Sequence, residues 1–118
     1  MQEENKTPTT PILRYQIMTI EELYRCYMPY IKFGGLFVKT KNTDFKLGDT
    51  VRLALTVLNE DNRYAVTGKV VWISPKGMGL NKPQGIGLQF DDKLDRLKVF
   101  IETQLAGMIN SDLPTYTI

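Results

Sequence analysis

"VRLALTVLNEDNRYAVTGKVVWIS", residues 51–74, contains two long alternating segments and decides the class of fold. Apolar residues recur at every second position from Val51 to Val57, so this segment predicts a strand with one apolar face. The polar residues 59–63 predict a turn, and residues 64–74 predict the next strand. Gly68 lies inside that second strand, which indicates a bulge or the bend of a barrel.

Three shorter apolar segments extend this β pattern. We expect strands at ILRYQIM (12–18), LFVKT (36–40) and IGLQF (86–90). Short strands separated by turn signals are typical of a small antiparallel β-barrel. The sequence therefore predicts a mainly β fold.

Two helices are expected around the strands. Thr19 and Glu22 fit the S/T-x-x-E capping box, which predicts a short helix over 20–27 that ends before Pro29. A long helix is predicted over 93–109, with Asp91 or Asp92 as its N-cap. Its apolar positions at helical spacing are Leu94, Leu97, Ile101, Leu105 and Met108.

Length and composition limit the organisation of the chain. At 118 residues, of which 42% are hydrophobic and 24% charged, it should form one globular domain. Residues 1–11 are too polar to stabilise an ordered conformation, so we expect a flexible N-terminus, a domain at 12–109 and a tail at 110–118. Without a long apolar run or a basic leader, the protein should be cytoplasmic and not inserted in a membrane.

Catalysis and metal binding have few suitable residues. The chain has no histidine, which removes the commonest general base, and Cys26 is its single cysteine. The acidic residues lie mostly at turns and helix starts, where capping explains them. We therefore expect no enzyme, no catalytic residue, no metal site and no cofactor.

A glycine pair precedes one of the predicted strands. In KFGGLFVKT, residues 32–40, Gly34 and Gly35 lie between a charged segment and an alternating apolar one. Glycine adopts positive φ and permits close backbone approach, so the pair predicts a bend, a bulge or a turn that faces a ligand.

Taken together, the motifs resemble those of the PilZ domain family, and within it the PilZ proteins of type IV pilus assembly. The pieces that carry the resemblance are LYxxYMPxIKxGGLF, VVWISPKG and the ending SDxPTxT, and the likeness covers residues 12–118. It implies a six-stranded antiparallel PilZ-type β-barrel with a short N-terminal helix and a C-terminal helix.

The family is known for receptors of cyclic di-GMP, which use an R-x-x-x-R element and a D/N-x-S-x-x-G element. Arginine forks pair with phosphates and guanine edges, and the acidic or amide side chain accepts from guanine. This chain has no R-x-x-x-R, and with Gly35 in the last position of the second element, Tyr30 replaces Asp or Asn and Lys32 replaces Ser. The ligand motif Tyr30, Lys32, Gly34 and Gly35 is thus degenerate, and the glycines should serve the backbone only.

The resemblance implies an adaptor for pilus biogenesis and twitching motility. The resemblance implies two partners: the pilus extension ATPase and a regulator with a degenerate EAL domain that binds cyclic di-GMP. We expect no nucleic-acid partner. Large aromatic and apolar side chains are enriched at such interfaces. The candidate partner-binding residues are Leu23, Tyr24, Tyr27, Met28, Trp72, Leu113, Pro114 and Tyr116. Because Pro114 ends the preceding helix, we expect the tail to leave the domain as an extended arm that adds little stability.

Two other functions remain open from the sequence. The domain could bind cyclic di-GMP or another nucleotide or nucleic acid directly, with phosphates held by Lys32, Lys39, Lys41 and Lys46. It could also be a carboxylate enzyme, but no pair of acids stands in a recognisable catalytic context.

Overall fold

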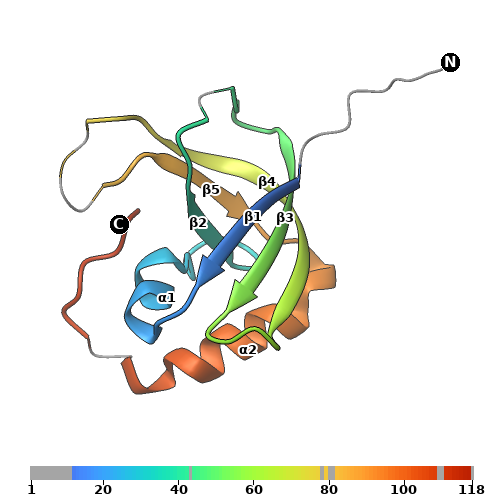
Figure 1. The fold of residues 1–118 in the computed structure, drawn as a ribbon, viewed down its shortest axis with the longest axis vertical. Helices are drawn as coiled ribbons and strands as arrows, with labels where there is room; N and C mark the ends of the chain where they lie inside the picture. The colour runs from blue at the N-terminus through green and yellow to red at the C-terminus, as the bar shows by residue number, and fades with distance from the viewer. Residues whose placement is uncertain (1–11, 43, 78, 80–81, 109–110, 118) are drawn as a thin grey trace, which may run out of the picture.

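The computed structural model describes residues 12–42, 44–77, 79, 82–108 and 111–117 (Figure 1). Five strands form one sheet: β1 (Ile12–Ile17), β2 (Gly35–Lys39), β3 (Thr50–Val57), β4 (Arg63–Ser74) and β5 (Gly85–Gln89). Helix α1 (Ile20–Cys26) lies between β1 and β2, and α2 (Asp95–Leu105) follows β5. Short 3-10 helices at Asp92–Leu94 and Ala106–Met108 flank α2.

The sheet is mixed, with strand order β1-β3-β4-β5-β2. The expectation of six antiparallel strands is wrong, because the described residues form five and β1 runs parallel to β3. A parallel pair needs a long connection that returns the chain to the same end of the sheet. The segment through α1, β2 and the following loop supplies that connection, and it places β2 at the opposite edge.

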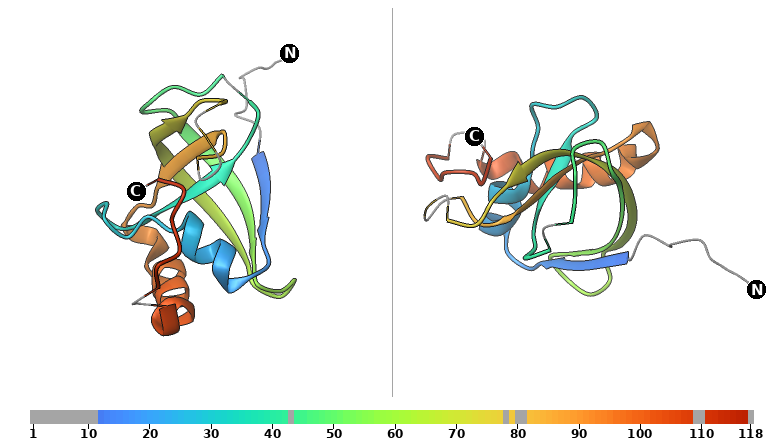
Figure 2. Two further views of the ribbon diagram at one scale, coloured as in Figure 1. Left: turned by 90° about the vertical axis from the view of Figure 1, so that its left-hand side faces the viewer. Right: turned by 90° about the horizontal axis from the view of Figure 1, so that it is seen from above.

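The sheet curls into a half-barrel around an apolar core (Figure 2). The alternation in β3 sends Val51, Leu53, Leu55 and Val57 inward, as the sequence predicts. The irregularity in β4 lies between Val70 and Trp72, not at Gly68, which keeps regular register with Val51. Gly68 is needed for close packing instead, since an added Cβ would lie 3.0 Å from the Gln89 carbonyl oxygen.

Both helices follow from their capping residues and apolar spacing. Thr19 caps α1, and its Oγ1 accepts a hydrogen bond from the Glu22 backbone N–H at 3.1 Å. Asp91 caps the 3-10 turn before α2, where its carboxylate accepts from the Lys93 backbone N–H. Leu97 and Ile101 bury the inner face of α2 against the core. Residues 109 and 110 of the predicted helix and tail lie outside the described residues.

Candidate functional site

The degenerate ligand motif forms a tight turn before β2. Phe33 and Gly34 both have positive φ, at 67° and 76°. The Gly34 N–H donates to the Ile31 carbonyl oxygen, and the Gly35 carbonyl oxygen accepts from the Met28 N–H, each at 2.9 Å. An added Cβ at Gly35 would lie 2.5 Å from the Leu88 carbonyl oxygen. Backbone geometry therefore accounts for both glycines.

The side chains of this turn face solvent. Tyr30 is 46% exposed and makes no hydrogen bond to another described residue. The Lys32 Nζ lies 5.1 Å above the Phe33 ring, and the Lys32 carbonyl oxygen accepts from the Gln89 amide at 3.1 Å. A small depression of about 270 Å³ adjoins the turn. It is lined by Phe33, Thr50, Thr67, Gly68, Lys69, Gln89, Phe90 and Asp91.

Helix α1 buries most of the residues that the sequence singled out on it. Leu23 and Met28 are fully buried, and Tyr27 is 4% exposed. The Tyr27 hydroxyl donates to Glu102 of α2 at 2.6 Å, so this ring joins the two helices. Tyr24 is half-buried, and its hydroxyl donates to the Ser111 carbonyl oxygen at 3.3 Å.

The C-terminal tail packs back onto α1 and β2 (Figure 1). Tyr116 is 7% exposed, and its ring lies 5.6 Å from the Phe37 ring. The Tyr116 N–H donates to the Arg25 carbonyl oxygen, and Thr117 is also buried. The expectation of a free arm is therefore wrong for the described residues 111–117. A backbone that is extended after Pro114 can still place the Tyr116 ring against the domain, beside Phe37.

A charged cluster holds this tail in place. The Glu22 carboxylate accepts from the Tyr116 hydroxyl at 2.7 Å and pairs with Lys39 at 2.8 Å, while the Lys39 ammonium lies 4.8 Å above the Tyr116 ring. Burial by itself would raise the pKa of Glu22, but hydrogen bonds from Lys39 and Tyr116 outweigh it and lower that pKa. We call Glu22, Lys39 and Tyr116 the tail latch.

The latch was not foreseen from the sequence. The sequence pattern predicts a capping box between Thr19 and Glu22, but only the Thr19 half of the box forms, because the Glu22 carboxylate points to Lys39 and Tyr116. No local pattern joins residues that lie so far apart in the chain.

The candidate partner-binding residues thus divide into two groups. Leu23, Tyr27, Met28 and Tyr116 contact the protein's own core. Tyr24, Trp72 and Leu113 are half-buried, and Pro114 is exposed. Trp72 packs partly against the core beside the bulge in β4.

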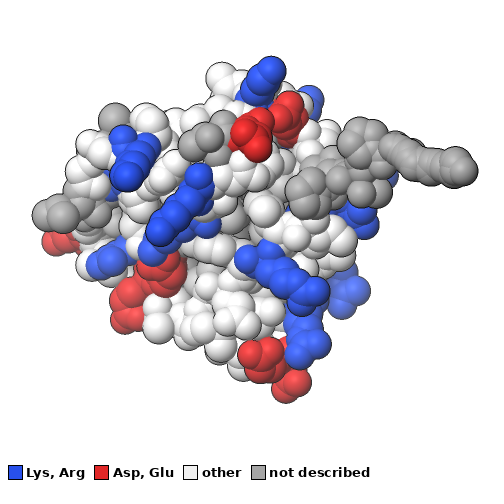
Figure 3. All heavy atoms as spheres, turned by 45° about the horizontal axis from the view of Figure 1, so that its top comes forward, with Lys and Arg blue, Asp and Glu red and all other residues white. Residues whose placement is uncertain are grey.

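The four lysines proposed for phosphates do not form one free cluster. Lys39 belongs to the tail latch and Lys32 lies over Phe33, while Lys41 and Lys46 are exposed. On the face seen in Figure 3, basic and acidic side chains both occur, with uncharged surface between them. A continuous basic stripe, typical of nucleic-acid binding, is not seen on that face.

Among the described residues, no three His, Cys, Asp or Glu side chains come together in a way that could hold a metal ion. Burial, with the nearby Glu22 carboxylate, raises the pKa of the Cys26 thiol to about 12. Cys26 is therefore a protonated core thiol at neutral pH.

None of the helices in the described part of the chain is long and apolar enough to cross a membrane. No match is found among curated proteins. Residues 9–107 match the PilZ domain, and this match spans most of the chain, from just before β1 to the end of α2. The curled sheet and the C-terminal helix lie within the matched range, and the chain belongs to the PilZ domain family.

Proposed function

We propose that this PilZ domain is a non-enzymatic adaptor for type IV pilus biogenesis and twitching motility. PilZ domains are binding or adaptor modules linked to cyclic di-GMP. In this proposal the chain contacts the pilus extension ATPase and the degenerate EAL-domain regulator, and it does not itself bind cyclic di-GMP. The proposal rests on the motifs described above and on the turn before β2.

The observation that carries the proposal is the chemistry of this turn. A cyclic di-GMP site of the family pattern needs a carboxylate or amide at position 30 and a hydroxyl at position 32. Here Tyr30 offers an exposed phenol, and the Lys32 ammonium lies over Phe33. Missing arginine forks and acceptors, at about 1–3 kcal/mol for each bidentate pair, would reduce a micromolar site to an undetectable one.

Partner contacts would then use what α1 and the tail leave accessible. Tyr24 and Leu113 are half-buried, Pro114 is exposed, and the Tyr24 hydroxyl links helix to tail through Ser111. A half-buried tyrosine beside apolar tail residues has the composition of an interface anchor. Beneath this surface would lie four buried side chains that hold it in place, those of Leu23, Tyr27, Met28 and Tyr116.

The test has two independent measurements. Calorimetric titration with cyclic di-GMP should give no heat, with an R-x-x-x-R PilZ domain as the positive control. Tyr24→Ala should weaken binding of the extension ATPase and the EAL regulator by about 2 kcal/mol, whereas Tyr30→Ala, at an exposed tyrosine away from α1, should not. Low-micromolar cyclic di-GMP binding, or equal effects of the two variants, would contradict the proposal.

Direct nucleotide binding is the second candidate. It is favoured by the depression beside the turn, where Phe33 offers a ring for stacking and Lys69 an exposed cation. Lys69→Gln should then weaken nucleotide binding and reduce its salt dependence. If no nucleotide binds at low salt, this candidate is wrong.

A further inference from the structure

The outward face of β1, β3 and β4 forms a regular grid of side chains. The registers of the three strands place Ile12, Arg52 and Thr67 in one row, then Arg14, Ala54 and Ala65, then Gln16, Thr56 and Arg63. These positions alternate with the buried ones and are all exposed except Thr56, which is half-buried. We call this grid the arginine face.

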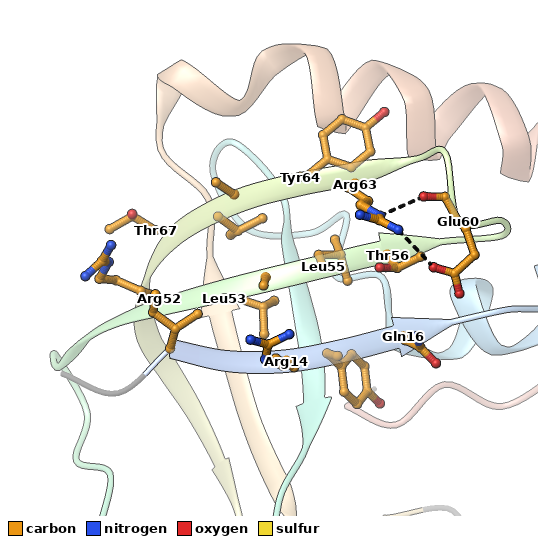
Figure 4. A pocket seen from close by; sticks show the side chains of 15 residues that line it. Arg14, Gln16, Arg52, Leu53, Leu55, Thr56, Glu60, Arg63, Tyr64 and Thr67 are labelled. Atoms are coloured by element: carbon orange, nitrogen blue, oxygen red, sulfur yellow. Dashed lines mark hydrogen bonds and ion pairs between the residues drawn. The ribbon is translucent and has the colours of Figure 1, made fainter.

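Each strand and each row of the grid carries one arginine. Ala54 lies at the centre of the grid and Ala65 directly opposite it on β4, and their small side chains line an open depression of about 590 Å³ (Figure 4). The three arginine side chains lie at separate places around this depression (Figure 4). The face therefore has a low centre surrounded by three cations.

The charges on this face are poorly neutralised. Arg63 pairs with Glu60 at 3.4 Å, but both side chains are largely exposed, so this ion pair is weak. Within the described part of the chain, Arg14 and Arg52 form no ion pair at all. Guanidinium groups stay protonated at every physiological pH. Among the described residues that line the depression, the three arginines are thus accompanied by one acid, Glu60.

The spacing of the arginines indicates the kind of ligand. Arg14 and Arg52 are diagonal neighbours on adjacent strands, a spacing of about 7–8 Å between residues on a sheet. Arg63 lies on β4, the next strand beyond that of Arg52. Charges distributed in this way suit several anions in series better than one compact phosphate. Guanidinium forks pair well with carboxylates, and Ile12, 52% exposed, and Ala54 add apolar contact.

We propose that the arginine face docks an extended acidic segment of a partner protein, with carboxylates placed on the three arginines and small side chains over Ala54 and Ala65. The face contains none of the residues assigned above to the adaptor surface. It would therefore be a second interaction surface, and its existence does not depend on whether the pilus assignment is correct.

The test uses a synthetic probe at low ionic strength. A fluorescein-labelled alternating Asp-Ala peptide of about a dozen residues is titrated with the full chain, beside its Asn-Ala counterpart. Fluorescence anisotropy should show binding of the Asp-Ala peptide only. Arg14→Gln with Arg52→Gln should weaken this binding about tenfold, as expected when charge-assisted pairs are lost, and should leave the melting temperature within a few degrees.

Two further variants make the result specific. Lys76→Gln with Lys82→Gln removes the same charge from the β4–β5 connection and should change affinity less than about twofold. Glu60→Gln removes the negative charge beside Arg63, keeps the 2.8 Å hydrogen bond from the Arg63 Nε to the backbone carbonyl oxygen of residue 60, and should strengthen binding by roughly twofold or more. Equal binding of the two peptides, or equal losses in the two double variants, would overturn the proposal. Displacement of the peptide by equimolar pyrophosphate or cyclic di-GMP would also overturn it and assign the face to phosphates.

Discussion

Gly35 begins β2 beside the backbone of the neighbouring strand β5, which leaves no room for a side chain. An added Cβ would lie 2.5 Å from the Leu88 carbonyl oxygen and equally near to the Ile31 side chain. A side chain can move away from such a contact, but the paired backbone of β5 cannot do so without losing ladder hydrogen bonds. The turn therefore depends on this glycine through packing, and on Gly34 through its positive φ.

Gly35→Ala should lower the free energy of unfolding by about 2–3 kcal/mol, because it overpacks a fixed backbone contact. The melting temperature should fall by roughly 10 °C in thermal denaturation followed by circular dichroism. Gly107→Ala is the matched control, since no atom lies within 4 Å of its added Cβ, and it should be neutral or slightly stabilising. Equal stability of the two variants would refute this role of Gly35.

Some of this site could be predicted from the sequence. The sequence predicts that Gly34 and Gly35 shape the backbone, and the structure has a positive φ at Gly34 and tight packing at Gly35. The positive φ of Phe33 was not foreseen, since non-glycine residues rarely adopt it. The burial of Tyr27 could not be distinguished from exposure either, because a tyrosine in an apolar stripe suits both a core and an interface.

The tail and helix α1 form one structural unit through the tail latch. Tyr116 contacts β2 through the Phe37 ring and through the Lys39 ammonium, which lies over the Tyr116 ring. It contacts α1 through hydrogen bonds to the Glu22 carboxylate and the Arg25 carbonyl oxygen. Long-range contacts of this kind leave no periodic signal in a nine-residue segment, so the sequence predicted an arm. The tail therefore stabilises the domain.

Truncation after Asn110 should destabilise the domain by about 3 kcal/mol, because a buried aromatic ring and its hydrogen bonds are lost. Tyr116→Phe keeps the ring and loses only the hydroxyl, so it should cost about 1–2 kcal/mol. Urea denaturation measures both variants, with Tyr30→Phe as the exposed control. If the truncated chain is as stable as the full chain, the tail adds little stability, as the sequence predicts.

The latch also predicts a pH dependence of stability. The pKa of Glu22 is lowered in the folded state, so its contribution is complete above the unfolded pKa of about 4.3 and is lost as the pH falls through the folded pKa. Glu22→Gln should cost about 1–2 kcal/mol at pH 7, and the difference from wild type should shrink below about pH 4. Glu60→Gln, at an exposed pair, should change stability little at either pH. A constant difference across this range would contradict the assignment.

At the scale of the whole molecule, local sequence patterns located the five strands and two α-helices of the described residues, but not the order of the strands in the sheet. The alternation of apolar and polar residues shows which face of β3 is buried, because this pattern is contained in a few consecutive residues. The parallel pairing of β1 with β3 depends on how distant segments pack, and no local signal reports it. The same holds for the arginine face, which exists only because three separate strands lie in one register.

This topology predicts an order of folding. The β3–β4 hairpin joins strands that are close in sequence, whereas β1 and β2 pair with distant strands and pay a larger loop-closure entropy. Pulsed hydrogen exchange during refolding should therefore protect the amides of Leu53 and Val66 before those of Leu36 and Val38, which face β5 in this register. Simultaneous protection of all four amides would show that the hairpin does not form first.

The position of β2 at the far edge has a consequence for synthesis on the ribosome. Gly35 finds its partner only when Gln89 has been made, and Ile12 must wait for Arg52. During translation both edge strands are thus unpaired for several seconds at ordinary rates of elongation, and β2 exposes an apolar segment for that time. Nascent chains stalled before β5 should bind holdase chaperones, and chains extended beyond Gln89 should release them.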